Sequence, residues 1–391
     1  MTNLLSGKAA IVGIGATEFS KNSGRSELRL AVEAIRMALD DAGLTAKDVD
    51  GMSVFTMETN PEIEVFRQIG GSELKFFSRI HYGGGAACAT LQQAAMAIAT
   101  GVAEVVVCYR ATNERSGHRF GTGIQNLQAA ATTESSHYGW YAPYGLLTPA
   151  SWVAMFAQRY LFETGATTEA FGHVAVADRR HAANNPAAWF YEQPITLEDH
   201  AASRWIVEPL RLLDCCQESD GAVAVVVTSA ERARDLRQKP AILTGVAQGA
   251  CDDQQMMTSF YRDDLTGIPE MGLVARQLYE QARITPKDIQ TAVIYDHFTP
   301  FVLCQLEEFG FCERGEAKDF VQGGNIEIGG GLPINPHGGQ LGEAYIHGLN
   351  GVAEGVRQIR GTSCNPVADV ENVLVTAGTG VPTSGLLLGQ A

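Results

Sequence analysis

Short apolar runs alternate with longer amphipathic stretches along most of this chain. Residues 8–15 (KAAIVGIG) form an apolar run that ends in glycines, which predicts a buried strand. From Ser26 to Ala42 the apolar positions recur with the spacing of one helix face, and Gly43 follows where a helix C-cap is expected. A second apolar run at 52–55 predicts another strand. This alternation predicts an α/β fold whose mixed or parallel sheets are covered by helices on both faces.

The same succession of elements occurs again in the C-terminal part of the chain. LTAKDVDGMSVF (44–55) aligns without a gap on ITPKDIQTAVIY (284–295), and Thr, Lys and Asp positions coincide. Upstream of the aligned segments, AIVGIG and AILTGV are apolar runs that each come before the helix of their copy. Downstream, each copy has a helix rich in alanine and glycine whose start is rich in glycine. Similar units also arise by chance in α/β proteins. The agreement in order and spacing nevertheless favours an internal duplication, with halves at about 1–240 and 241–391.

Residues from about 112 to 205 interrupt the first half with a segment rich in aromatic and polar side chains. Long segments between regular elements often carry binding function, so we expect this insertion to cover a ligand site. Aromatic clusters more often belong to a core, which is the alternative interpretation. The aromatic residues concerned are Trp140, Tyr141, Tyr144, Trp152 and Trp189.

Composition limits the class of protein. The chain has 391 residues, of which 45% are hydrophobic and 19% charged, so we expect a large folded core and no extended disorder. The formal charge of −15 argues against nucleic-acid and membrane partners, but it is compatible with a local basic patch that binds an anionic small molecule such as an acyl-CoA. The N-terminus has no secretory signal pattern and no apolar run is long enough to span a bilayer, so a cytoplasmic protein is expected.

The eight cysteines show no CxxC motif and no Cys/His spacing suited to zinc, which predicts free thiols and no metal site. The adjacent Cys215 and Cys216 are interpreted as packed thiols. Glycine runs at 83–85, 329–331 and 377–380 lack the Lys-Ser/Thr of a phosphate-binding loop. They are interpreted either as turns between buried elements or as loops whose amides approach a carbonyl oxygen.

Four segments of the chain resemble the thiolase superfamily, most closely its lipid-transfer-protein branch related to sterol carrier protein X thiolase. They are IVGIGATEF near the N-terminus, PLRLLDCCQESDGAVAVVVTS (209–229), YDHFTPFVLCQLEEFGFC (295–312) and INPHGGQLGEAYIHGLNG (334–351). The resemblance covers nearly the whole chain. It implies a five-layered αβαβα fold built from two similar halves, a homodimer and acyl-CoA thioester substrates.

The chain departs from a working thiolase at the positions that supply thiol chemistry. The family places a nucleophilic cysteine at the N-terminus of a buried helix, where the helix dipole stabilises the thiolate. Aligning HYGGGAACATLQQAAMAIATGVAE by the family's helix length places about Gly84 there, with Cys88 one turn further on. The second family cysteine falls within VTAGTG, where Ala377 precedes Gly378 and Gly380. We therefore expect Gly84 and Gly380 to lie in an oxyanion-binding region without a nucleophile.

Two tyrosines stand at family active-site positions. Tyr295 begins Tyr-Asp-His-Phe where relatives carry His-Asp-Cys-Phe or Asn-Glu-x-Phe, and Tyr345 takes the histidine position of Gly-His-Pro. A phenol can give or take a proton in a dry pocket. On a strand end Tyr295 and His297 point to the same face while Asp296 points away. We therefore expect Tyr295, Tyr345 and His297 to be catalytic, with ordinary packing as the alternative, and His347 to be a packed or surface histidine.

A thiolase-type pocket that lacks its cysteine still polarises a thioester and stabilises an enolate, so retro-aldol cleavage of a β-hydroxyacyl-CoA is accessible. We assign Tyr345 as the base toward the hydroxyl and Tyr295 as the acid.

The combination resembles the thiolase-like aldolases of bacterial steroid degradation. That resemblance implies cleavage of a 17-hydroxy steroid side-chain CoA thioester to a 17-ketosteroid and propionyl-CoA, with no cofactor beyond the CoA of the substrate. It also implies a small OB-fold partner in an α₂β₂ assembly. Two alternatives stay open: a non-catalytic acyl-CoA or lipid-binding protein, and an acyltransferase that uses Cys88.

Overall fold

The computed structural model describes residues 4–81, 83–117, 119, 121, 139–255, 257–378 and 383–391. In these residues nine strands form a mixed sheet with the order β3-β2-β4-β7-β1-β8-β11-β10-β9, and β5 and β6 form a small second sheet. The strands are β1 (Ala9–Ala16), β2 (Gly51–Phe55), β3 (Phe76–Ile80), β4 (Val105–Asn113), β5 (Trp205–Val207), β6 (Leu210–Arg211), β7 (Asp220–Ser229), β8 (Ala241–Gly249), β9 (Thr291–Val293), β10 (Asn372–Ala377) and β11 (Thr383–Gly389).

The strand order of the first half is repeated in the second. In β3-β2-β4-β7-β1 the first three strands are parallel and the last two run antiparallel to their neighbours. In β9-β10-β11-β8 the pairing is again parallel and then antiparallel, and Ile334 bridges Ala292 of β9 where β3 would stand. The halves join through two residue pairs between β1 and β8. This is the topology that a duplicated unit predicts, while the boundary at about residue 240 stays a prediction.

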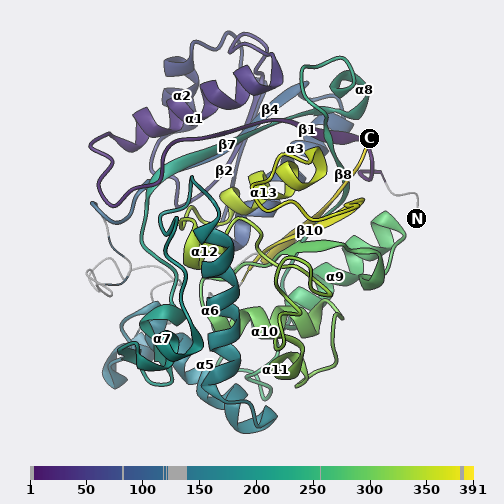
Figure 1. Cartoon of the computed structure of the whole chain (residues 1–391). Helices are drawn as coiled ribbons and strands as arrows, with labels where there is room; N and C mark the ends of the chain where they lie inside the picture. The colour runs from purple at the N-terminus through teal and green to yellow at the C-terminus, as the bar shows by residue number, and fades with distance from the viewer. Residues whose placement is uncertain are drawn as a thin grey trace.

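Helices form three layers around the two half-sheets (Figure 1). The apolar face of α1 packs on one face of the first half-sheet, and α9 and α10 pack on the outer face of the second. Side chains of α3 and α13 pack between strands of both halves. The layers therefore alternate as helix, sheet, helix, sheet and helix, which confirms the thiolase-like five-layered fold. The helices named are α1 (Glu27–Ala42), α3 (Ala87–Ala99), α9 (Pro269–Ala282), α10 (Thr299–Glu308) and α13 (Leu349–Arg360).

The described part of the predicted insertion forms helices that pack on the C-terminal half. Side chains of α5 and α6 share a core with α9 and α10. Trp152 lies in this region with 6% exposure, whereas Trp140 and Tyr144 are exposed, so the aromatic residues do not form one cluster. The remaining helices are α2 (Glu62–Ile69), α5 (Pro149–Thr164), α6 (Thr168–Ala183), α7 (Leu197–Ala202), α8 (Ala230–Ala233), α11 (Ala317–Phe320) and α12 (Gly339–Gly342).

Local sequence signals explain where the elements begin and end. Ser26 is the N-cap of α1, and its side chain accepts a hydrogen bond from the Arg29 N–H; Gly43 ends the helix in the left-handed conformation.

All eight cysteines are free thiols, as predicted. Among the described residues, no helix is both long and apolar enough to cross a membrane.

Candidate active site

The side chains of Tyr295 and Tyr345 meet although they come from separate segments. Tyr295 follows β9 and Tyr345 lies between α12 and α13. The Tyr295 hydroxyl donates to Oη of Tyr345 over 3.2 Å, with the ring centroids 6.4 Å apart. Tyr295 is 3% exposed, and Tyr345 is partly buried as a whole residue. The structure thus brings together the two tyrosines that the sequence predicts to be catalytic.

The Tyr295 phenol fills the space that a side chain at position 84 would need. Gly84 opens a short turn (Gly84–Ala86) that leads into α3. A Cβ atom built on Gly84 would overlap with Oη and Cζ of Tyr295. Interiors are close-packed, so a larger residue at position 84 and the phenol cannot both occupy this space without a shift. The helix start at which the resemblance to thiolases leads us to expect a cysteine is covered by a tyrosine from the other half.

A closed ring of three hydrogen bonds holds the backbone of Tyr295. Its N–H donates to Oγ1 of Thr376 (2.9 Å), the Thr376 hydroxyl donates to Oε1 of Gln305 (2.6 Å), and Nε2 of Gln305 donates to the Tyr295 carbonyl (2.8 Å). All three residues are buried. Because every member is bonded within the ring, the strand end that carries the phenol is held rigidly. Sequence reasoning missed Gln305 and Thr376; a glutamine within an apolar helix was the available signal.

His297 lies beside Tyr295, as the strand alternation predicts. The two ring centroids are 4.8 Å apart, and the imidazole stacks on Phe301 at 5.0 Å with an interplanar angle of 12°. Burial lowers the pKa of His297 to about 3, and a backbone hydrogen bond with Tyr295 opposes this shift. His297 is therefore neutral near pH 7.

His347 is packed, and it also lies at the tyrosine pair. Its ring centroid is 4.7 Å from that of Tyr345, and its Nδ1 accepts a hydrogen bond from Nε of Arg110 over 3.2 Å. Arg110 is itself buried and paired with Glu58 at 3.2 Å. Burial and the Arg110 charge lower the pKa of His347 well below its ordinary value. Sequence reasoning missed Arg110 and Glu58, which reach the site from the first half.

Both phenols keep their protons at neutral pH. Burial raises the pKa of Tyr295 and of Tyr345 well above the ordinary phenol value. For Tyr295 the hydrogen bond with Tyr345 opposes part of this rise, whereas for Tyr345 it adds to it. The pair therefore presents two neutral hydroxyls, each able to donate one proton and accept another.

The thiol of Cys88 lies in the central core. Cys88 is fully buried near the start of α3, and its Sγ donates to the Val375 carbonyl over 3.6 Å. Burial raises the pKa of this thiol, so the nucleophilic thiolate is disfavoured. This geometry argues against an acyltransferase that uses Cys88.

Cys216 contributes its backbone to the site region, because its N–H donates to the His297 carbonyl over 2.9 Å. Burial raises the pKa of its thiol well above the ordinary value.

Gly380, the second predicted oxyanion residue, lies outside the described residues. Within the described part of the chain, no group of three His, Cys, Asp or Glu side chains is arranged to hold a metal ion.

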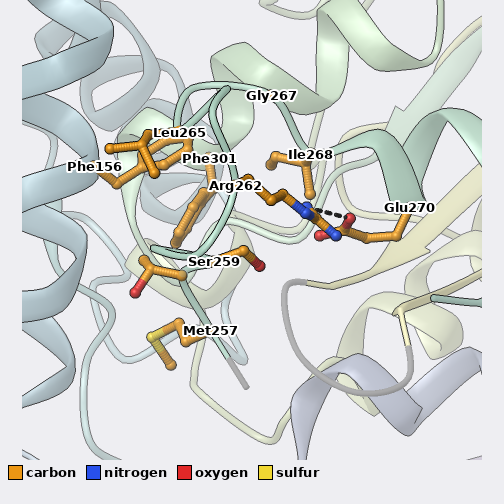
Figure 2. Close-up of a pocket in the computed structure, with 10 residues that line it drawn as sticks. Phe156, Met257, Ser259, Arg262, Leu265, Gly267, Ile268, Glu270 and Phe301 are labelled. Carbon is orange, nitrogen blue, oxygen red and sulfur yellow. Dashed lines mark hydrogen bonds and ion pairs between the residues drawn. The ribbon is translucent and has the colours of Figure 1, made fainter. Parts of the chain in front are cut away.

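A separate pocket adjoins the site through Phe301. Figure 2 shows Phe156 and Phe301 on one side of this pocket and the ion pair of Arg262 with Glu270 on the other. The Nη1–Oε2 distance of that pair is 2.8 Å. Phe301 also stacks on His297, which lies beside Tyr295. These two rings connect the pocket to the tyrosine pair. The lining residues are Phe156, Met257, Thr258, Ser259, Arg262, Leu265, Gly267, Ile268, Glu270 and Phe301.

Comparisons with known proteins agree with this fold. A family model described as the thiolase C-terminal domain matches residues 250–387. The chain is 67% identical over 387 residues to a steroid side-chain-cleaving aldolase of Thermomonospora curvata, covering 99% of both chains. It is 68% identical over 386 residues to the 17-hydroxy-3-oxo-4-pregnene-20-carboxyl-CoA lyase of Mycobacterium tuberculosis, covering 99% of this chain and 100% of that one.

A solved structure described as Ltp2-ChsH2(DUF35) aldolase superposes with a TM-score of 0.95 at 67% identity, covering 99% of both chains. The chain belongs to the thiolase superfamily and, within it, groups with the side-chain-cleaving aldolases.

Proposed function

We propose that this chain is a carbon–carbon lyase that cleaves a β-hydroxyacyl-CoA by retro-aldol chemistry. The observation that carries the proposal is the Tyr295 phenol, which fills the space beside Gly84 and hydrogen-bonds to Tyr345. The names of two relatives at 67% and 68% identity support a 17-hydroxy steroid side-chain CoA thioester as substrate. Its products are a 17-ketosteroid and propionyl-CoA.

The tyrosine pair moves one proton from the substrate hydroxyl to the substrate carbon. Tyr345 accepts the hydroxyl proton while it passes its own phenolic proton to Oη of Tyr295; in the same step the carbonyl forms and the Cα–Cβ bond breaks, leaving its electron pair in a CoA enolate. Tyr295 then protonates the enolate carbon. Because the two hydroxyls are 3.2 Å apart, the proton gained by Tyr345 replaces the one that Tyr295 gives away, and neither phenol has to remain charged.

The surrounding groups keep this transfer within the pair. His297 is neutral, so it lies beside Tyr295 without competing as a charged acid. Backbone amides around Gly84 hold the enolate oxygen. The cleavage moves a proton and an electron pair within one substrate, so its balance requires no oxidant, reductant or cofactor beyond the CoA moiety.

The assembly is part of the same proposal. The solved relative is described as Ltp2-ChsH2(DUF35) aldolase, a name that joins two components and supports a DUF35 partner for this chain. The small OB fold of that partner and the α₂β₂ assembly rest on the family resemblance. Strand β3 lies at one end of the described sheet and Phe77 on it is 66% exposed, which supports pairing of two copies at this edge. Eight free thiols support a reducing compartment such as the cytoplasm. Sedimentation of the chain alone and with the partner measures both associations.

The decisive experiment incubates the purified chain, with and without the DUF35 partner, with a β-hydroxyacyl-CoA that bears a tertiary alcohol. Ketone and acyl-CoA should form in equal amounts. Tight substrate binding without either product, under both conditions, would instead support a non-catalytic acyl-CoA-binding protein.

A further inference from the structure

Asp296 directly follows Tyr295, but its side chain binds the segment that carries Tyr345. Its Oδ1 accepts the N–H of Gln340 over 2.8 Å, and its Oδ2 accepts the N–H of Leu341 over 2.9 Å. These two amides belong to α12, which ends shortly before Tyr345. The carboxylate is fully buried, so water does not compete for either bond.

The fit between Asp296 and α12 depends on a glycine. Gly339 has a φ of +64°, and a Cβ atom at this position would collide with Oδ2 of Asp296. Glycine therefore permits both the left-handed backbone and the close approach of the carboxylate. The contact is built into the backbone of α12 and does not depend on a flexible side chain of that helix.

A second buried carboxyl group, Asp178 of α6, lies next to Asp296. Burial and the Asp296 charge raise the pKa of Asp178 well above its ordinary value, so Asp178 stays neutral. Burial also raises the pKa of Asp296 to about 6, and its bonds with Asp178, Gln340 and Leu341 oppose that rise. Near neutral pH the negative charge therefore resides on Asp296, where two amides stabilise it.

We propose that Asp296 is a positioning residue that sets the separation of the two phenols. The other anchors bind each tyrosine elsewhere: the Tyr295 N–H to Thr376, and the Tyr345 N–H to Oγ of Ser219 over 3.1 Å. Asp296 instead links the two tyrosine-bearing segments to each other. Proton transfer needs hydrogen-bond distance, so a small displacement of one segment interrupts it. The inference rests on the proposed function of the tyrosine pair.

The test compares Asp296→Asn with wild type in the complex with its partner. The amide places an N–H₂ group against a backbone N–H, so one of the two bonds is lost. We expect kcat to fall about tenfold to a hundredfold while KM changes less than about twofold, because the substrate surface is untouched.

Asp50 provides a matched control in the first half. It is buried, and its Oδ1 accepts the N–H groups of Glu104 and Val105, each over 2.9 Å. Asp50→Asn keeps these two bonds on Oδ1 and removes those of Oδ2, which accepts the Glu104 N–H and Nζ of Lys75, each over 3.2 Å. It therefore also costs a buried carboxylate a backbone N–H bond, in a part of the chain that does not carry the phenols. It should lower the melting temperature and leave kcat unchanged.

Two further variants separate positioning from general stability. In a Tyr345→Phe background, Asp296→Asn should cause little additional loss of kcat, because the interaction on which it acts is already gone. Gly339→Ala keeps the Asp296 carboxylate, but the added methyl group occupies the position of its Oδ2 and displaces it. This variant should show the same loss of kcat even if Asp296→Asn does not fold.

Wild-type kcat in Asp296→Asn or Gly339→Ala, an equal fall in Asp50→Asn, or losses that multiply in the Tyr345→Phe background would overturn the proposal. Absence of cleavage by the wild-type complex would instead refute the proposed function.

Discussion

The two halves of this molecule share one strand order and contribute opposite things to the site. The first half supplies Gly84, which is space at the start of a buried helix. The second half supplies both phenols, one on the segment after β9 and one on the segment after α12. The absence of a side chain at position 84 in the first half is therefore what makes room for Tyr295 of the second half.

The two halves also differ in how many hydrogen bonds fix the residues that they supply to the site. Tyr295 is fixed through Thr376 and Gln305, and Asp296 ties it to the Tyr345 segment. Gly84 needs no such support because it offers only room and backbone. Substitutions in the second half should therefore remove chemistry, whereas substitutions at the first-half helix should act by displacing the phenol.

The largest expected effect comes from removing either hydroxyl. Tyr295→Phe and Tyr345→Phe keep the ring and delete the proton-transfer group, so kcat should fall by about 10²–10⁴-fold with the circular dichroism spectrum unchanged. Steady-state kinetics of both variants measures this. Full activity in both would refute the assigned roles.

A smaller loss is expected from Gly84→Ala. The added methyl group overlaps with the Tyr295 hydroxyl, so the phenol must shift, at a cost of about 1–3 kcal/mol in the free energy of unfolding, and kcat should fall about tenfold or more. Gly139→Ala is the control, because a Cβ there meets no atom of the described residues within 4 Å. If Gly84→Ala were as active as this control, the phenol would not depend on the space at position 84.

His297 should make the second half sensitive to acid. Its pKa is about 3 in the folded chain against 6.5 ordinarily, so below pH 6.5 the unfolded chain takes up a proton that the folded chain excludes. The stability due to neutral His297 is complete above pH 6.5 and is lost as pH falls toward 3. Between pH 8 and pH 5 wild type should lose about 2 kcal/mol more than His297→Gln in denaturant unfolding. An equal loss in both proteins would show that His297 is not held neutral.

The smallest effect is expected at Cys88 in the first half. Its thiol donates to the Val375 carbonyl inside the core and has no part in the proposed reaction. Cys88→Ala should keep kcat within about twofold, and iodoacetamide should not inactivate the folded wild type by labelling this residue. Inactivation that maps to Cys88 would restore the acyltransferase hypothesis.

Local patterns in the sequence were sufficient for the elements and their repetition. The apolar run at 8–15 corresponds to β1 at Ala9–Ala16, and the periodic stretch from Ser26 corresponds to α1 with Ser26 as its cap. Strand alternation also placed His297 beside Tyr295 and turned Asp296 away from it. These properties depend on the periods of strands and helices, which a sequence displays directly.

The partners of the phenols were beyond such patterns because they come from distant segments. Thr376 bonds to Gln305 across 71 positions, and Arg110 bonds to His347 across 237. His347 also has a φ of +51°, so the regular periodicity that would orient it does not apply at this turn. Only the packing of the two halves brings these residues to the site.

The most direct test of a reaction without a thiol measures, in one experiment, the products formed from the substrate and the mass of the protein. The wild-type complex is given a β-hydroxyacyl-CoA without added CoA, quenched during turnover and analysed as intact protein and as small-molecule products. We predict equal amounts of ketone and acyl-CoA with no acyl adduct on the protein. Product formation that requires free CoA, with an acyl group on Cys88 during turnover, would contradict the central role of the tyrosine pair.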